Sequence, residues 1–438
     1  MYFYYFKLAL LSLRKTPLLT LLMVAMIAIG IGATMTTYTI SYMMSKDPIP
    51  NKSANLYQVQ LDSLNYEFAD NDILPNTIAY QDVQALLKSD IPKNHVALGA
   101  IQTEIGPIDN PSIERQTLEV RTATSDFFAM FEVPFLHGGG WSEQDGKDAA
   151  QVAVLSKETN GWLFNGENSV GRTFYFGKDT YRVIGVLDDW NPLPKYYELS
   201  YAAFKKPNGV FIPFNTQIKN EFLTLKLISN YCWKEPDDQS FAALLTSECM
   251  WIIFWVELSN AQDRDQYQAF IDNHAKEQQA LGRFPRRIFN KLLPLKEYLT
   301  DEEIVSDDSK MAVWLAALFL LVCLLNCMSL MIAKFDAKAG EIGLRRAVGA
   351  SQNDIIKQFA IELSVIGLAG GLLGLLFAKL GLMAAANTYH YLHSGLMQMN
   401  SQLLMSTVML AVVSSLLFGL YPITKASRMQ PSSQLKSL

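Results

Sequence analysis

The sequence predicts a membrane protein with four transmembrane α-helices and a large α+β domain outside the membrane. Half of its 438 residues are hydrophobic and its mean hydropathy is +0.11, whereas soluble chains of this size rarely average above zero. Four apolar windows are each long enough to cross a bilayer, which takes about 20 apolar residues. Lys and Arg gather near these windows on one side, as in a multi-span protein.

The four spans are expected where apolar residues run without charge for the thickness of a bilayer. They cover residues 17–44, 311–333, 363–386 and 403–421. The first apolar stretch is longer than that of a signal peptide and has no A-x-A cleavage site, so we expect it to stay in the membrane. A further apolar run, 250–256, is too short to span and is expected to be a buried strand.

Basic residues predict the orientation of the chain. They gather in 1–16, 334–362 and 422–438, three segments that four spans place on the same side. The positive-inside rule makes that side the cytoplasm, so both termini are cytoplasmic and 45–310 and the short loop 387–402 lie outside. Segment 45–310 is acidic, with 25 Lys and Arg against 38 Asp and Glu. The formal net charge of the whole chain is −5, which argues against binding of nucleic acid.

The N-terminal segment 1–16 predicts an amphipathic helix in the membrane interface. Phe3, Phe6 and Leu10 recur at helical spacing, and Pro17 interrupts the pattern before the first span. Contact with a partner protein is the second interpretation of this segment.

The outer segment predicts one split subdomain with another inserted into it. Its ends, 54–106 and 221–300, show β-α-β patterns of similar size, and we expect them to pair as an α+β subdomain that resembles a ferredoxin-like fold. The middle, 107–220, shows an all-β pattern with glycine-rich turns and is expected to form an inserted, mostly-β subdomain. Its strands are expected at 117–122, 152–155, 173–176, 181–187 and 210–213.

Cysteines and histidines give no predicted metal or catalytic site. Cys232 and Cys249 lie in the outer segment, where an oxidising compartment would permit a disulfide, but their spacing leaves bonded and free thiols both open. Cys323 and Cys327 are one turn apart in the second span and are expected to pack there. Two pairs, His390 with His393 and His274 with Glu277, provide too few ligands to predict a metal site.

Small residues follow one face of the third span. They are Gly367, Gly370, Gly371 and Gly374, and we expect them to allow close helix packing. Lys379, farther along the same span, is expected to reach the outer interface, although a buried functional charge is the alternative.

The most informative stretch is GEIGLRRAVGAS, residues 340–351, in the loop between the second and third spans. It predicts a short amphipathic helix that stops at Gly349, followed by a helix that Ser351 caps, with Asp354 at the capping-box position. Two interpretations stay open. The short helix lies on anionic lipid, or it is a docking element for a cytoplasmic protein.

This stretch resembles the E-I-G-x-R-x-A-x-G-A signature of the FtsX/MacB family of ABC-transporter permeases. Other segments resemble the family in the same order along the chain. They are residues 127–139, 152–156, 168–172, 181–186, 210–213 and 419–428. Each piece is short, but their order and spacing together extend the resemblance over nearly the whole chain.

The resemblance implies a permease of the mechanotransmission type in a bacterial inner membrane, whose loop couples to an ATPase. The implied coupling residues are Glu341, Ile342, Gly343, Arg345, Arg346, Gly349 and Ala350. The sequence has no G-x-x-x-x-G-K-[ST] phosphate loop, so the ATPase is expected to be a separate subunit that binds ATP and Mg²⁺. This chain is then not an enzyme and binds no cofactor. A second permease chain, identical or related, is expected because paired ATPase sites need two docking surfaces.

The leading hypothesis is MacB-like export of a peptide, small toxin or antibiotic from the periplasm. The outer domain would pass this substrate to a periplasmic adaptor and a TolC-like outer-membrane duct. Extraction of lipoproteins and FtsX-like control of a cell-wall hydrolase are the alternatives. The large split outer domain favours export, and no motif supports a membrane-anchored enzyme.

Overall fold

The structure is a computed structural model that divides into two compact units. One unit comprises Met1–Ser45 and Val305–Leu438, and the other is Lys46–Ile304. The residues it describes are 2–65, 74–108, 114–199, 203–222, 231, 232, 234, 236, 238, 240–388 and 394–428.

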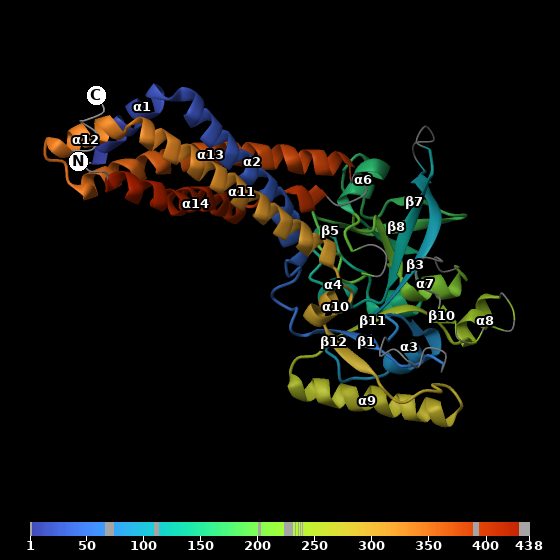
Figure 1. Cartoon of the computed structure of the whole chain (residues 1–438). Coiled ribbons are helices and arrows are strands. Elements are labelled where there is room, and N and C mark those ends of the chain that lie inside the picture. The colour runs from blue at the N-terminus through green and yellow to red at the C-terminus, as the bar shows by residue number, and fades with distance from the viewer. Residues whose placement is uncertain are drawn as a thin grey trace. The chain divides into compact units, whose positions relative to one another are not determined.

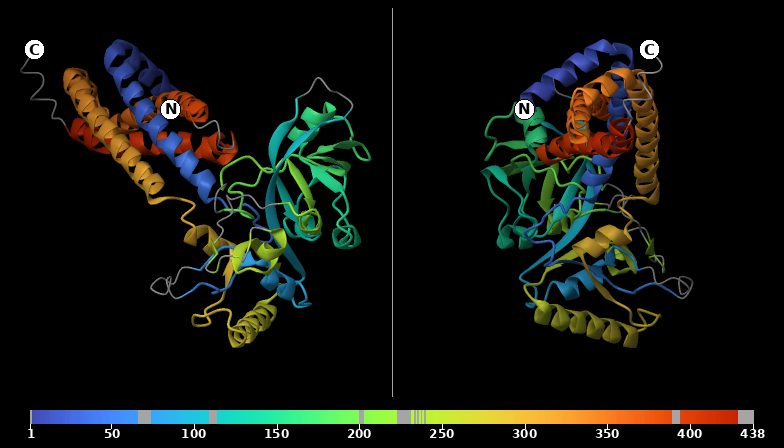
Figure 2. Two further views of the ribbon diagram at one scale, coloured as in Figure 1. Left: turned by 90° about the vertical axis from the view of Figure 1, so that its right-hand side faces the viewer. Right: turned by 60° about the vertical axis from the view of Figure 1, so that its left-hand side comes forward.

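The first unit is a bundle of long helices. Four helices of the described chain are long and apolar enough to cross a membrane: α2 (Pro17–Ser45), α11 (Asp307–Ala337), α13 (Gln352–Thr388) and α14 (Ser401–Ser427). They lie side by side, with α13 packed against both α2 and α14 (Figures 1 and 2). The amphipathic segment at the N-terminus forms α1 (Tyr2–Lys15), which also packs on α13.

The membrane helices extend beyond the predicted spans because hydropathy locates apolar residues and not helix ends. The start of α13 is set by a capping box, in which the N–H of Asp354 donates to Ser351 Oγ (3.2 Å) and the N–H of Ser351 to Asp354 Oδ2 (3.1 Å). At the start of α11, the N–H of Ser309 donates to Ser306 Oγ, a simple N-cap. The last of these helices, α14, continues past Pro422 to Ser427.

Glycines bring α13 close to its neighbours. A Cβ at Gly370 would lie 2.6 Å from Ile27 Cγ2 of α2, and one at Gly371 would lie 2.8 Å from Ala411 Cβ of α14. Gly374 and Gly367 repeat these two contacts one turn away, against Ile31 and Ser415. The glycine face therefore packs against two helices at once.

Other residues of the spans lie where packing or lipid would place them. Cys323 and Cys327 are free thiols buried in α11, and a Cβ at Gly30 would lie 3.2 Å from Cys323 Cβ. Lys379 is exposed on the surface of α13. His390 and His393 lie outside the described residues.

The second unit is built on one sheet of twelve strands in the described residues. The strands on its main path are β12 (Lys291–Pro294), β1 (Leu56–Gln60), β11 (Cys249–Glu257), β3 (Asn94–Pro107), β4 (Gln116–Ala123), β9 (Val210–Pro213), β6 (Val152–Leu155), β8 (Asp179–Leu187) and β5 (Phe135–Gly138), in that order. Three more pair beside this path: β2 (Ile78–Ala79), β7 (Thr173–Phe176) and β10 (Tyr231–Cys232).

The two β-α-β segments pair as the sequence predicts. β11, from the second segment, lies between β1 and β3 of the first, and all these neighbours are antiparallel. Their helices are α3 (Tyr80–Leu86) and α9 (Ala261–Ala280). Two shorter helices complete this half, α8 (Phe241–Thr246) and α10 (Leu295–Asp301). This half is the split α+β subdomain.

The inserted half is a closed ring of strands. β3, β4, β9, β6, β8 and β7 pair in turn, and β7 returns to β3. Because β3 belongs to both halves, the insertion continues the first sheet. A buried apolar cluster fills this half, with Ile101, Val120, Phe174, Tyr181 and Ile212 among its members.

Helices interrupt the all-β pattern of 107–220, so the inserted half is mostly β and not wholly β. They are α4 (Phe127–Met130), α5 (Glu143–Lys147), α6 (Lys157–Phe164) and α7 (Phe214–Lys219). Helices this short complete few turns, so their apolar residues show no clear 3.6-residue period.

The structure joins Cys232 of β10 to Cys249 of β11 in a disulfide. It does not bring His274 and Glu277 together as a site. His274 is buried against Asp82 of α3, with 2.9 Å between His274 Nε2 and Asp82 Oδ1, while Glu277 is exposed.

Candidate coupling site

The signature stretch forms its own short helix, α12 (Ala339–Ala347), between α11 and α13. The helix stops where the sequence predicts, because Gly349 has a φ of +107°, which residues with side chains rarely adopt. The N–H of Ala350 donates to the carbonyl of Arg345 (3.0 Å) and satisfies one of the last carbonyls of the helix. The chain therefore turns sharply before it enters α13.

The inner face of α12 is buried in the bundle. Ile342 is only 3% exposed and belongs to the same apolar cluster as Phe335 of α11 and Ile355 and Phe359 of α13. Gly343 is buried as well. Of the predicted coupling residues, these two hold α12 against the bundle and present no side chain to a partner.

The two arginines of α12 also face the bundle. Arg345 donates to Gln358 Oε1 of α13 (2.7 Å) and to Glu341 Oε1 (2.6 Å). Arg346 donates to the carbonyl of Ser427 at the end of α14 (3.2 Å). Their position in the last turn of α12 is also favourable for a positive charge. These hydrogen bonds to Gln358 and Ser427 fasten α12 to its neighbours.

The end of α12 exposes two large apolar side chains. Leu344 is 57% exposed and Val348 is 83% exposed. With α1 and α13 they line an open groove of about 470 Å³, called here the α1–α12 groove. Its lining residues are Tyr4, Tyr5, Leu8, Leu344, Arg345, Val348, Ala350, Asp354, Ile355 and Gln358. Leu344, Val348 and Tyr4 are not among the coupling residues that the sequence predicts. Large apolar side chains on helices that also carry charges were the available signal.

Two contacts place α1 beside α12. The hydroxyl of Tyr5 donates to Asp354 Oδ1 at the start of α13 (3.0 Å). Lys15 Nζ lies 3.8 Å from Glu341 Oε2 of α12. The groove is therefore composite, with one wall from the N-terminal helix and the other from the signature helix.

A buried polar cluster, called here the Glu362 network, lies behind the groove. Glu362 of α13 pairs with Lys334 of α11 and accepts a hydrogen bond from Ser12 Oγ of α1 (2.8 Å). The side chains of Lys334 and Glu362 are 1% and 2% exposed. Lys338, at the junction of α11 and α12, donates to Ser12, and burial lowers the pKa of Lys338 against the opposing effect of Glu362. The network joins three helices.

These features define a multi-span membrane protein with a large domain inserted between its first and second spans. Residues 20–272 match the family described as "MacB-like periplasmic core domain", and residues 313–431 match "FtsX-like permease C-terminal". The chain belongs to this family of MacB-like and FtsX-like permeases. Its inserted domain is therefore extracytoplasmic.

Curated relatives share low identity over much of the chain. The "Macrolide export ATP-binding/permease protein MacB" of Marinobacter nauticus is 24% identical over 73% of this chain and 43% of its own length. The "Pyoverdine export ATP-binding/permease protein PvdT" of Pseudomonas entomophila is 24% identical over 71% of this chain and 42% of its own length. The MacB protein of Acinetobacter baylyi is 22% identical over 98% of this chain and 59% of its own.

This chain thus spans about half the length of the curated relatives it matches. Among solved structures, the periplasmic region of MacB from Actinobacillus actinomycetemcomitans matches 59% of this chain and 96% of its own, with 14% identity and a TM-score of 0.37.

Proposed function

We propose that this chain is the permease subunit of an ATP-driven, MacB-like export system. In this proposal a partner ATPase docks on the cytoplasmic side of the bundle, and ATP hydrolysis there moves the membrane helices. The helices transmit this motion to the periplasmic domain. That domain moves a periplasmic substrate toward an adaptor and a TolC-like outer-membrane duct.

The α1–α12 groove is the observation that supports coupling most directly. It presents Leu344 and Val348 on a helix whose other face is buried and hydrogen-bonded to α13 and α14. Aromatic Tyr4, at 63% exposure, extends the apolar surface onto α1. An exposed apolar patch with a polar rim is typical of a protein-binding site. A rigidly held helix would pass the motion of a docked partner to α13 and α14.

Export is supported by the names of the relatives. The matched proteins are named for export of macrolides and of pyoverdine, and their names include an ATP-binding function. For this chain we propose a peptide, a small toxin or an antibiotic as substrate. ATP and Mg²⁺ would bind outside these 438 residues, on an ATPase that we propose to be a separate subunit. Two permease chains would assemble with a pair of ATPase subunits, with both termini of each chain in the cytoplasm.

Affinity purification of the chain in mild detergent, followed by mass spectrometry of the associated proteins, tests this proposal. We expect an ABC ATPase together with a periplasmic adaptor and an outer-membrane duct protein. An ATPase accompanied by a lipoprotein or by a cell-wall hydrolase would reject export and support extraction or FtsX-like regulation. Absence of any ATPase from a stable preparation would reject the coupling role.

A further inference from the structure

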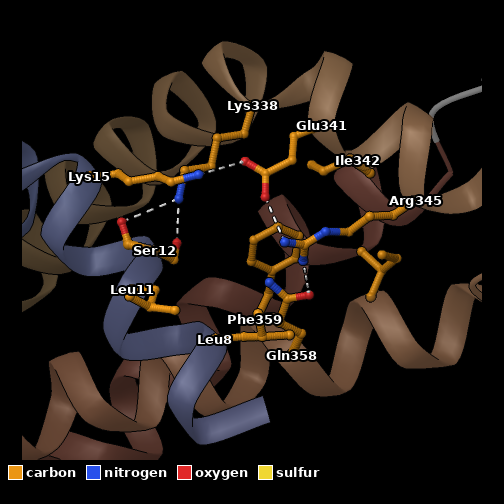
Figure 3. A pocket seen from close by; sticks show the side chains of 11 residues that line it. Leu8, Leu11, Ser12, Lys15, Lys338, Glu341, Ile342, Arg345, Gln358 and Phe359 are labelled. Atoms are coloured by element: carbon orange, nitrogen blue, oxygen red, sulfur yellow. Dashed lines mark hydrogen bonds and ion pairs between the residues drawn. The ribbon is translucent and has the colours of Figure 1, made fainter. Parts of the chain in front are cut away.

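A second, smaller pocket lies next to the α1–α12 groove, between α1, α12 and α13 (Figure 3). Its volume is about 150 Å³. A water molecule takes up roughly 30 Å³ in the liquid, so this is room for a group of a few heavy atoms and not for a whole lipid or peptide. Its lining residues are Leu8, Leu11, Ser12, Lys15, Lys338, Glu341, Ile342, Arg345, Ile355, Gln358 and Phe359.

Positive charge predominates in this pocket. Lys15, Lys338 and Arg345 line it, against the single carboxylate of Glu341. Figure 3 shows Glu341 between Lys15 and Arg345, with Lys338 above Ser12. Glu362, which accepts from Ser12, pairs with Lys334 and also attracts Lys338. With this pair included, four cations face two carboxylates, so the net charge around the pocket stays positive.

The cations keep capacity to bind an anion. Lys15 Nζ is 3.8 Å from Glu341, beyond hydrogen-bond distance, and its side chain is 68% exposed. Lys338 donates to the hydroxyl and carbonyl oxygens of Ser12. An ammonium group has three donors, so both lysines can donate to an added oxyanion without loss of these contacts.

The surroundings of the pocket match the membrane interface. Apolar side chains of α1, among them Phe6 (44% exposed), Leu10 (41%) and Leu11 (49%), lie on the surface of a helix that leads directly into α2. An amphipathic helix with basic residues near its end is typical of a segment that lies in the headgroup region. Basic pockets at this depth bind phosphate-bearing headgroups.

We propose that this pocket binds a phosphate group, supplied by the headgroup of an anionic phospholipid. The phosphate would lie among Lys15, Lys338 and Ser12, and the acyl chains would follow the apolar surface of α1. Bound lipid would hold α1 against α12 and α13, and so stabilise one wall of the α1–α12 groove. The binding requires no ATPase.

The test is a ligand titration of the purified, delipidated full-length chain in neutral detergent. The rise in the melting temperature of the chain reports binding. The ligands are short-chain phosphatidylglycerol, short-chain phosphatidylcholine and inorganic phosphate. Phosphatidylglycerol should bind at least about 10-fold more tightly than phosphatidylcholine. Lys15→Gln with Lys338→Gln should weaken phosphatidylglycerol binding roughly 30-fold, because each lysine contributes roughly 5-fold to the affinity for an anionic headgroup. Inorganic phosphate that binds as tightly as phosphatidylglycerol would keep the phosphate site but reject lipid as its source.

A charge-matched control is available on α1 and α13, two of the helices that line the pocket. Lys7 of α1 and Lys357 of α13 are exposed and lie outside the pocket lining, so Lys7→Gln with Lys357→Gln should change the affinity less than about 3-fold. Equal loss in both double variants, or equal affinity for the two lipids, would overturn the proposal. Should the Lys338 change unfold the chain, Lys15→Gln alone decides, with an expected loss of roughly 5-fold.

Discussion

Glu362 is the residue at which three helices meet, since it pairs with Lys334 of α11 and accepts from Ser12 of α1. A buried ion pair gains little net stability over apolar residues, but removal of one partner leaves a buried charge uncompensated. Its position at the base of α12 suggests a role in holding α1, α11 and α13 in one arrangement.

We expect Glu362→Gln to destabilise the chain by about 3–5 kcal/mol, because Lys334 would stay buried without its carboxylate. The free energy of unfolding of the full-length chain in detergent measures this. The double variant Lys334→Met with Glu362→Leu removes both charges and should recover most of the loss. If the single variant were as stable as the parent chain, the ion pair with Glu362 would not be what stabilises the buried charge of Lys334.

At the scale of elements, glycine spacing determines how closely α13 approaches α2. Alanine normally gains about 0.5–1 kcal/mol over glycine within a helix. At Gly370, however, the added Cβ would lie 2.6 Å from Ile27 Cγ2 and 2.9 Å from Ile27 Cβ. Overpacking of this kind costs about 1–3 kcal/mol, so the steric cost outweighs the helix propensity.

Gly370→Ala should therefore lower the unfolding free energy in detergent. Gly340→Ala on α12 is the matched control, because nothing lies within 4 Å of its Cβ and the change should be neutral or stabilising. Similar effects of the two substitutions would contradict the packing role of the glycine face.

The sequence predicts elements well where one strong pattern determines them. β6, β7 and β9 have the predicted bounds, because turn residues delimit short apolar runs. The stop at Gly349 and the cap at Ser351 follow from local backbone chemistry. The directions of Arg345 and Arg346 depend on the partners Gln358 and Ser427, which are distant in sequence, so the pattern of α12 alone does not reveal them.

The buried pair of Lys334 and Glu362 was missed for a related reason. In sequence both are charges at the ends of neighbouring apolar windows, where exposure at the interface is the ordinary outcome. They come together only in the fold, where the end of α11 meets α13 and Phe335 also contacts Phe359. Two opposite charges at the same end of adjacent spans would have been the available signal.

For the whole molecule, the proposed orientation makes a direct prediction. In intact cells a membrane-impermeant maleimide should label Lys147→Cys in the outer domain and leave Lys7→Cys in α1 unlabelled until the membrane is permeabilised. Both lysines are exposed, and the free thiols Cys323 and Cys327 are buried in α11. Labelling of Lys7→Cys in intact cells would show that the topology is the reverse of the proposed one. The α1–α12 groove would then lie outside the cytoplasm, where no ATPase could dock.

In the proposed mechanism the exposed apolar surface of α12 binds an ATPase subunit. Co-purification of that ATPase with the Val348→Asp variant tests this binding most directly. Val348 makes no contact that holds α12 in the bundle and is 83% exposed, so the chain itself should remain folded. Gly340→Asp, on the same helix and outside the groove lining, is the matched control. Burial of an unpaired carboxylate in the interface costs about 2–5 kcal/mol, so Val348→Asp should weaken ATPase binding at least roughly 30-fold while Gly340→Asp keeps it. Equal recovery of the ATPase with both variants would contradict the claim.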